Sequence, residues 1–159
     1  MLRPMISLSR HTIRLLLTFL VVSTTLLSCQ KYSNEDYEGQ WQLIEIAESD
    51  GTSAQDVKPY QIYWRLQLGL IQIMSTGLEE ERNPGEIIAR FQVEQGQLQI
   101  TSVYWSLREA DIPLVEAEEF ARIAIYGISS APETFQIIEM NTSRMVLQSS
   151  AHRLTFRKF

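Results

Sequence analysis

From Trp41 to the C-terminus, apolar and polar residues alternate with a period of two. Because successive side chains of a β-strand point to opposite faces, this period predicts strands with one buried face. The clearest alternating runs cover residues 62–70, 87–93, 98–104, 145–148 and 154–157. Turn-forming residues separate several of them, including Gly96 and the stretch Asn141-Thr142-Ser143. The pattern therefore predicts an all-β fold, either a small antiparallel barrel or a sandwich.

The alternation changes phase at two places, Leu43–Ile44 and Leu70–Ile71. An extra residue in a strand produces such a change, so both places are interpreted as β-bulges. Barrels use bulges to bend a strand around a corner. Both phase changes therefore fit a barrel.

Residues 116–126 break the period of two. Acidic residues come first, apolar residues follow at Phe120 and Ile123, and Gly127 comes directly after the segment. Acidic residues at the start and a glycine after the end are typical of a short amphipathic helix. The β-branched second half of the segment leaves a strand as the alternative.

The first 28 residues are typical of a targeting segment. Arg3, Arg10 and Arg14 precede an uncharged run over residues 15–27, which is rich in Leu and Val. A helix of that length spans about 20 Å, whereas the hydrocarbon core of a bilayer is about 30 Å thick. A permanent membrane-spanning helix is therefore disfavoured.

Cys29 is the single cysteine of the chain and follows Leu26-Leu27-Ser28. This stretch resembles the lipobox of bacterial lipoproteins. The resemblance implies that the thiol of Cys29 receives a diacylglyceryl group, that the chain is cut just before Cys29, and that the new amino terminus is often acylated, as with palmitate. Two or three acyl chains anchor a protein stably where one binds only marginally. Residues 1–28 are then a lipoprotein signal peptide.

Residues 29–38 are polar and lack a clear period, and we interpret them as a lipidated tether. In enterobacterial lipoproteins an Asp after the Cys favours the inner membrane, and Gln30 stands there instead. That resemblance favours an outer-membrane lipoprotein of the cell envelope, attached through Cys29. Lys31 followed by acidic residues is similar to the surface-export signal of Bacteroidetes lipoproteins, so the periplasmic and the surface face both remain open.

Gly39-Gln40-Trp41 begins the first expected strand, and the last contains Leu154-Thr155-Phe156-Arg157-Lys158. Together they resemble the lipocalin superfamily, in particular the lipocalin-like domains of Bacteroidetes lipoproteins, over residues 39–159. The resemblance implies an up-and-down β-barrel of about eight strands with one short helix, which requires residues 60–74 to bend into two strands. It also implies that Trp41 closes one barrel end beneath a basic residue. Lys158 shares the inward face of Leu154 and Phe156 and is the first candidate for that residue; Arg157 is the second, and an ordinary core position is the alternative for Trp41.

The composition argues against most catalytic chemistry. All 19 acidic residues follow Cys29 but only 11 of the 14 basic ones do, so the chain from Cys29 onward carries a net charge of −8. Such a surface disfavours nucleic acid. His152 is the only histidine after the signal segment, which leaves no Cys/His metal site and no Ser-His-Asp triad. The acidic clusters at residues 79–81 and 116–119 are interpreted as solvated faces. We expect no catalytic residue, no metal and no cofactor.

Aromatic residues on the central strands are candidate ligand contacts. By the period of two, Trp64 and Tyr104 share the expected inner face with Phe91, whereas Tyr63 and Trp105 point outward. Aromatic side chains in a barrel can grip an apolar ligand, and ordinary core packing is the alternative. We therefore predict a lipid-anchored envelope protein whose barrel binds a small apolar ligand or a partner protein. The alternative is a structural or accessory subunit of an outer-membrane or surface complex, with a filled barrel and no small-molecule ligand.

Overall fold

The computed structural model describes residues 37–159; the expected signal peptide, Cys29 and most of the tether lie outside the described residues. The strands are β1 (Gly39–Glu48), β2 (Gln55–Asp56), β3 (Ile62–Gln67), β4 (Leu70–Ser75), β5 (Ile87–Glu94), β6 (Gln97–Ser106), β7 (Asp111–Pro113), β8 (Glu133–Met140), β9 (Arg144–Gln148) and β10 (His152–Lys158). The helix α2 (Ala117–Ile123) continues into the 3-10 turn η3 (Ala124–Tyr126), and two further turns are η1 (Lys58–Tyr60) and η2 (Glu80–Arg82).

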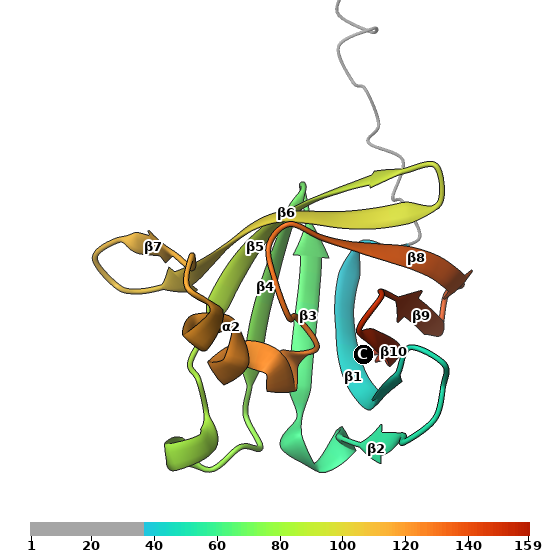
Figure 1. The fold of residues 1–159 in the computed structure, drawn as a ribbon, viewed down its shortest axis with the longest axis horizontal. Coiled ribbons are helices and arrows are strands. Elements are labelled where there is room, and N and C mark those ends of the chain that lie inside the picture. The colour runs from blue at the N-terminus through green and yellow to red at the C-terminus, as the bar shows by residue number, and fades with distance from the viewer. Residues whose placement is uncertain (1–36) are drawn as a thin grey trace, which may run out of the picture. The chain divides into compact units, whose positions relative to one another are not determined.

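The strands form a closed antiparallel barrel (Figure 1). Eight strands follow the order β10-β9-β8-β6-β5-β4-β3-β1, and β1 pairs with β10 to close the ring. The short strands β2 and β7 add to β1 and β6 at the margin. Each of the eight strands neighbours the next barrel strand along the chain, so the predicted up-and-down barrel is confirmed.

The inward-facing residues of the eight strands form one continuous core. Its largest fully buried side chains are those of Trp41, Trp64, Tyr126, Phe135 and Phe156. Alternation produces this core directly: Ile62, Trp64 and Leu66 of β3 are buried while the residues between them are more exposed. Burial of this apolar surface is the main force that holds the barrel closed.

The two phase changes have different structural causes. At Leu43–Ile44 the register between β1 and β10 shifts, so the predicted bulge is confirmed. At Leu70–Ile71 the prediction of a bulge is wrong, because Leu68 and Gly69 form a two-residue turn and the chain reverses into β4. This turn divides residues 60–74 into β3 and β4 and supplies the eighth strand.

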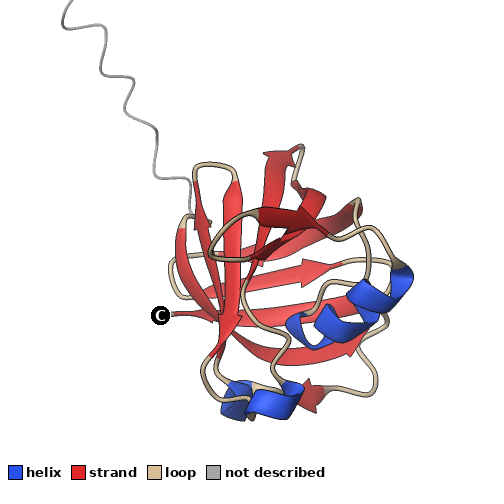
Figure 2. Ribbon diagram, turned by 90° about the vertical axis from the view of Figure 1, so that its left-hand side faces the viewer, coloured by secondary structure: helices blue, strands red, loops and turns tan. Residues whose placement is uncertain are grey.

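Residues 117–126 are helical, which decides the open alternative between helix and strand (Figure 2). Glu116 and Glu119 form a capping box at the start of α2, which satisfies backbone N–H groups that the helix leaves unpaired. Gly127 ends η3 with a φ of +85°, a conformation that favours glycine. Phe120 and Ile123 bury the apolar face of α2 in the core. Within residues 37–159, no helix has the length and apolar character needed to cross a membrane.

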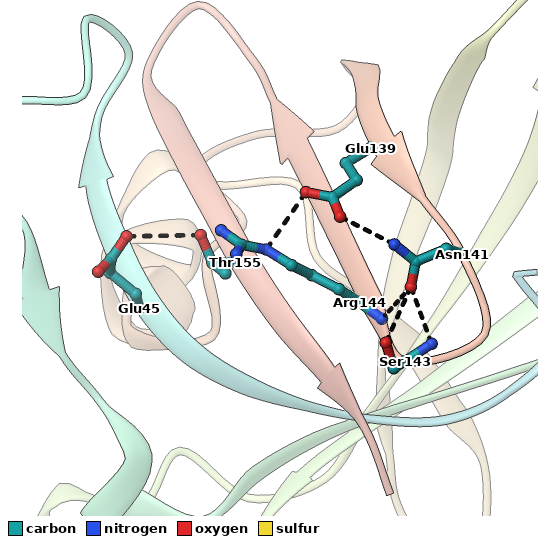
Figure 3. A network of polar contacts seen from close by, with 6 residues as sticks. All are labelled: Glu45, Glu139, Asn141, Ser143, Arg144 and Thr155. Carbon is teal, nitrogen blue, oxygen red and sulfur yellow. Dashed lines mark hydrogen bonds and ion pairs between the residues drawn. The ribbon is translucent and has the colours of Figure 1, made fainter.

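The turn between β8 and β9 is stabilised by Asn141 (Figure 3). Its Oδ1 accepts hydrogen bonds from Ser143 N at 2.9 Å and Arg144 N at 2.8 Å, which is the expected chemistry of an Asn-containing turn. Its Nδ2 donates to Glu139 Oε1, and Glu139 also forms an ion pair with Arg144 at 3.3 Å. Asn141 therefore acts as a turn residue, as the sequence predicts.

Candidate functional site

Trp41 and Lys158 close one end of the barrel. They are direct partners in the β1–β10 register, and Lys158 Nζ lies 4.2 Å from the centroid of the Trp41 ring. The Lys158 ammonium also donates a hydrogen bond to the backbone carbonyl of Glu38. Arg157, the second candidate, instead donates from Nε to Gln42 Oε1 at 2.8 Å. The basic residue over the indole is therefore Lys158.

Gly39 leaves the space that Lys158 occupies. Its φ is +119°, and a Cβ at this position would lie 2.9 Å from Lys158 Nζ, closer than ordinary contacts allow. Trp41 is fully buried, and its Nε1 donates to the carbonyl of Tyr37 at 2.7 Å. The Gly-x-Trp pattern thus has a local physical reason: the glycine admits the lysine that covers the tryptophan.

Trp64 lies at the centre of the barrel interior. Its Nε1 donates to the carbonyl of Tyr126 at 3.1 Å, so the one polar atom of the indole is satisfied inside the core. The edges of two neighbouring rings meet it, with centroid distances of 5.0 Å to Phe156 and 6.4 Å to Phe135. Such edge-to-face pairs add to the packing of buried aromatic residues.

The interior around Trp64 is filled by side chains. A side chain next to a void large enough for water keeps some accessible surface, yet Ile62, Trp64 and Leu66 have none. Phe91 keeps 7% and packs edge-on against Tyr37 at 5.7 Å between ring centroids. In this conformation Trp64 and Phe91 are core residues that pack against neighbouring rings.

Tyr104 lies on the outer face, so its predicted inward orientation is wrong. The cause is a bulge in β6: Arg90 pairs with Ser102 but Phe91 pairs with Ile100, which leaves Thr101 as an extra residue. An extra residue moves all later side chains to the opposite face. Hydrogen bonding to Ser102 lowers the pKa of the exposed Tyr104 hydroxyl.

Trp105 consequently takes the inward face and meets helix α2. Its Nε1 donates to Glu119 Oε1 at 3.2 Å, and the Arg122 guanidinium lies 5.0 Å from the ring centroid. The other oxygen of the Glu119 carboxylate accepts from the backbone N–H groups of Val115 and Glu116. These bonds, led by the one from Glu116, lower the pKa of Glu119. Trp105 thus fixes the helix against the barrel.

Tyr126 is a buried residue that the alternation of apolar and polar residues does not single out. Its hydroxyl donates to the Gly85 carbonyl at 2.7 Å and lies 3.1 Å from Asn83 Oδ1. Burial, reinforced by the negative charge of Glu86, raises the pKa of Tyr126 to about 12. The hydroxyl therefore joins the helical segment to the loop before β5. A tyrosine directly before the helix-ending glycine was the only signal of a special position.

A surface pocket lies away from the Trp41 end, beside the last residues of β1. It has a volume of about 380 Å³. Ala47, Val57 and Ile125 supply apolar wall, and the polar lining includes Glu48, Arg82 and His152. His152 is the first residue of β10, directly after the turn from β9, and is half-buried. The pocket offers space for a small amphipathic molecule.

Comparisons with known proteins agree with this barrel. A family model described as "Lipocalin-like domain" matches residues 24–159. The chain belongs to this family of lipocalin-like domains. Among curated proteins, none matches the chain. This lipocalin-like chain is also similar in structure to two solved proteins from Bacteroides species.

A lipocalin-like protein from Bacteroides uniformis ATCC 8492 aligns with a TM-score of 0.57 at 20% identity, over 79% of this chain and all of that one. An uncharacterized protein from Bacteroides eggerthii DSM 20697 aligns with a TM-score of 0.54 at 18% identity, over 77% of this chain and 99% of that one. At such low identity the likeness concerns the fold alone. The lipocalin-like barrel and the recognition of the family from the Gly39 and Lys158 motifs are thereby confirmed.

Proposed function

We propose that this lipocalin-like protein is a lipid-anchored accessory protein of the cell envelope, whose filled barrel binds a partner protein through its surface. The packed interior carries the proposal: Trp64, the leading candidate for an internal ligand contact, has no accessible surface. Ligand-binding barrels instead enclose a cavity, commonly of about 300–1,000 Å³. The barrel then acts as a rigid scaffold that presents its outer face.

The anchor is the second part of the proposal. Support comes from the sequence, where Leu26-Leu27-Ser28 precedes Cys29 and a basic and then an apolar segment precede both. Cys29 would carry the acyl chains, and residues 30–38 would connect them to the barrel. An outer-membrane location follows from Gln30, on the resemblance given above. The domain is non-catalytic in this proposal, and His152 at the surface pocket acts as a wall residue.

Two measurements test the proposal separately. Cys29→Ala should leave the precursor unlipidated and uncleaved, which mass spectrometry and gel mobility would show; a variant that is processed normally and stays in the membrane fraction would refute the anchor. For the barrel, the purified protein is titrated with a fluorescent fatty acid. We expect no saturable binding; saturable one-to-one binding that quenches tryptophan emission would refute the filled-barrel proposal.

A second candidate function is favoured by the surface pocket beside β1. Its apolar wall and the Arg82 guanidinium suit a small amphipathic acid, held outside the core, and Glu48 and His152 also line the pocket. Ala47→Leu would place a larger side chain at the pocket wall and should abolish such binding. NMR titration with a short-chain fatty acid would report it, through shifts of the His152 ring signals. Shifts that persist in Ala47→Leu would exclude this pocket.

A further inference from the structure

We infer that the Leu68-Gly69 turn between β3 and β4 inserts into the surface of the bilayer that carries the anchor. This inference rests on the proposed lipid anchor at Cys29. In it, the end of the barrel that carries the β3–β4 turn faces the membrane. The occupant of this apolar tip is thus a lipid bilayer. Four independent features of the turn and its surroundings support the inference.

The turn exposes apolar side chains. Leu68 is 68% exposed and Leu70 is 39% exposed. Together with Ile88 of β5 they line a shallow groove of about 260 Å³ on the outer face of β3, β4 and β5. At the tip of the hairpin, the Leu68 side chain is too exposed to contribute to the hydrophobic core of its own domain. Leaving it in water forgoes the favourable burial that an apolar environment would provide.

The backbone of the turn does not favour leucine. Leu68 has a φ of +53° and Gly69 a φ of +75°, the conformation of a type I′ turn. Asn or Asp before Gly is the usual choice, because other side chains are strained at positive φ. The turn between β5 and β6 has the same conformation, and it carries the polar Gln95 before Gly96. A turn of this conformation therefore accepts a polar residue. The stability of the fold does not explain the choice of leucine at position 68.

The turn lies where the tether reaches the domain. The backbone N–H of Leu68 donates to Glu38 Oε1 at 3.3 Å, and Figure 1 places the start of β1 and the β3–β4 turn at one end of the barrel. Glu38 comes nine positions after Cys29. Nine residues span at most about 30 Å even when fully extended. An acyl anchor at Cys29 therefore keeps the turn within reach of the bilayer surface.

Two arginines flank the apolar tip on the outer face. Arg65 is held by Gln40 Oε1 at 3.1 Å and Gln72 Oε1 at 2.7 Å, and Arg90 is the register partner of Leu70. Both are exposed although the chain from Cys29 onward carries a net charge of −8. Cationic groups around an apolar tip are attracted to anionic lipid headgroups. The carboxylate of Glu38 also lies beside the tip, where it accepts the Leu68 N–H at 3.3 Å.

The test uses the full lipidated protein in vesicles of phosphatidylethanolamine and phosphatidylglycerol at a ratio of about three to one, a composition with anionic headgroups. Gln67→Cys places a thiol beside the intact Leu68, and the lipidated Cys29 offers no competing thiol. An environment-sensitive fluorophore on this thiol should show blue-shifted emission that nitroxide-labelled lipids quench. The same label on Ser53→Cys, in the loop between β1 and β2, should keep the emission seen in water.

Leu68→Asn in the Gln67→Cys background is the matched variant. It should lose the blue shift and the quenching while it stays vesicle-bound through its lipid. Labels at positions 67 and 53 that both report water on vesicle-bound protein would overturn the inference and leave the anchor intact. Failure of the protein to be lipidated, seen by mass spectrometry, would refute the proposed anchor instead. A blue shift that grows with protein concentration without vesicles would show a second copy on the tip and overturn the inference.

Discussion

Lys158 lies over the indole of Trp41, with Nζ 4.2 Å from the ring centroid, and the two residues face each other across the β1–β10 pair that closes the barrel. The first and last strands of the domain are thus joined by side chains as well as by backbone hydrogen bonds. Lys158 also donates to the Glu38 carbonyl, which ties the entering chain to the same end. Removing the ammonium should therefore weaken the closure of the whole barrel.

Lys158→Met should lower the free energy of unfolding by about 0.5–2 kcal/mol, because methionine keeps an apolar stem over the indole but loses the cation–π contact and the hydrogen bond to the Glu38 carbonyl. Lys158→Ala should cost more, since it also removes the covering stem. Chemical denaturation of the purified domain measures both. A methionine variant as stable as the wild type would mean that the stem alone covers Trp41.

Gly39→Ala should destabilise the barrel for two reasons, its φ of +119° and the approach of the new Cβ to Lys158 Nζ. Gly51 is the matched control, because its φ is +81° but nothing lies within 4 Å of an added Cβ. Gly51→Ala should therefore cost about 1–2 kcal/mol from the backbone alone. Gly39→Ala should cost more, and combining it with Lys158→Ala should recover part of the excess. Equal losses at the two glycines would contradict the steric role of Gly39.

The period of two predicts the strands and their buried faces, because alternation reports directly which face is buried. The closed barrel and its Trp41–Lys158 cap follow from the resemblance of the terminal motifs to lipocalin-like domains. Two local features could not be predicted. A Leu-Gly pair is not a typical turn signal, so the change of phase at Leu70–Ile71 by itself predicts a bulge, whereas the chain turns at Leu68 and Gly69. Nothing in the sequence around Thr101 indicates an extra residue in the strand. The alternation alone therefore places Tyr104 inward and Trp105 outward, whereas the bulge at Thr101 exchanges the two faces. Both depend on pairing with a neighbouring strand rather than on local preference.

Tyr126 should make stability fall as the pH rises from about 10 to 12. The folded pKa is raised to about 12, whereas an unfolded tyrosine titrates near 10, so the unfolded state releases its proton first. Stability from this group is complete below pH 10 and is lost towards pH 12. Tyr126→Phe should cost about 1–2 kcal/mol at neutral pH, through loss of the bond to the Gly85 carbonyl.

Across the alkaline window the wild type should lose roughly 2–3 kcal/mol more than Tyr126→Phe. Urea unfolding at several pH values between 9 and 12 measures this difference, and the tyrosines common to both proteins cancel in it. Parallel pH profiles for the two proteins would show that the Tyr126 hydroxyl titrates normally.

Leu68→Asn tests whether leucine at this turn stabilises the fold or serves the proposed contact with the bilayer. Asparagine adopts positive φ more readily than leucine, so at a φ of +53° the variant should be more stable by up to about 1 kcal/mol. Thermal unfolding without vesicles measures this gain, with Gln95→Leu in the equivalent turn as the reciprocal control that should lose stability. If Leu68→Asn is destabilising, leucine at this turn serves the fold itself, and its exposure gives no reason to look for a bilayer.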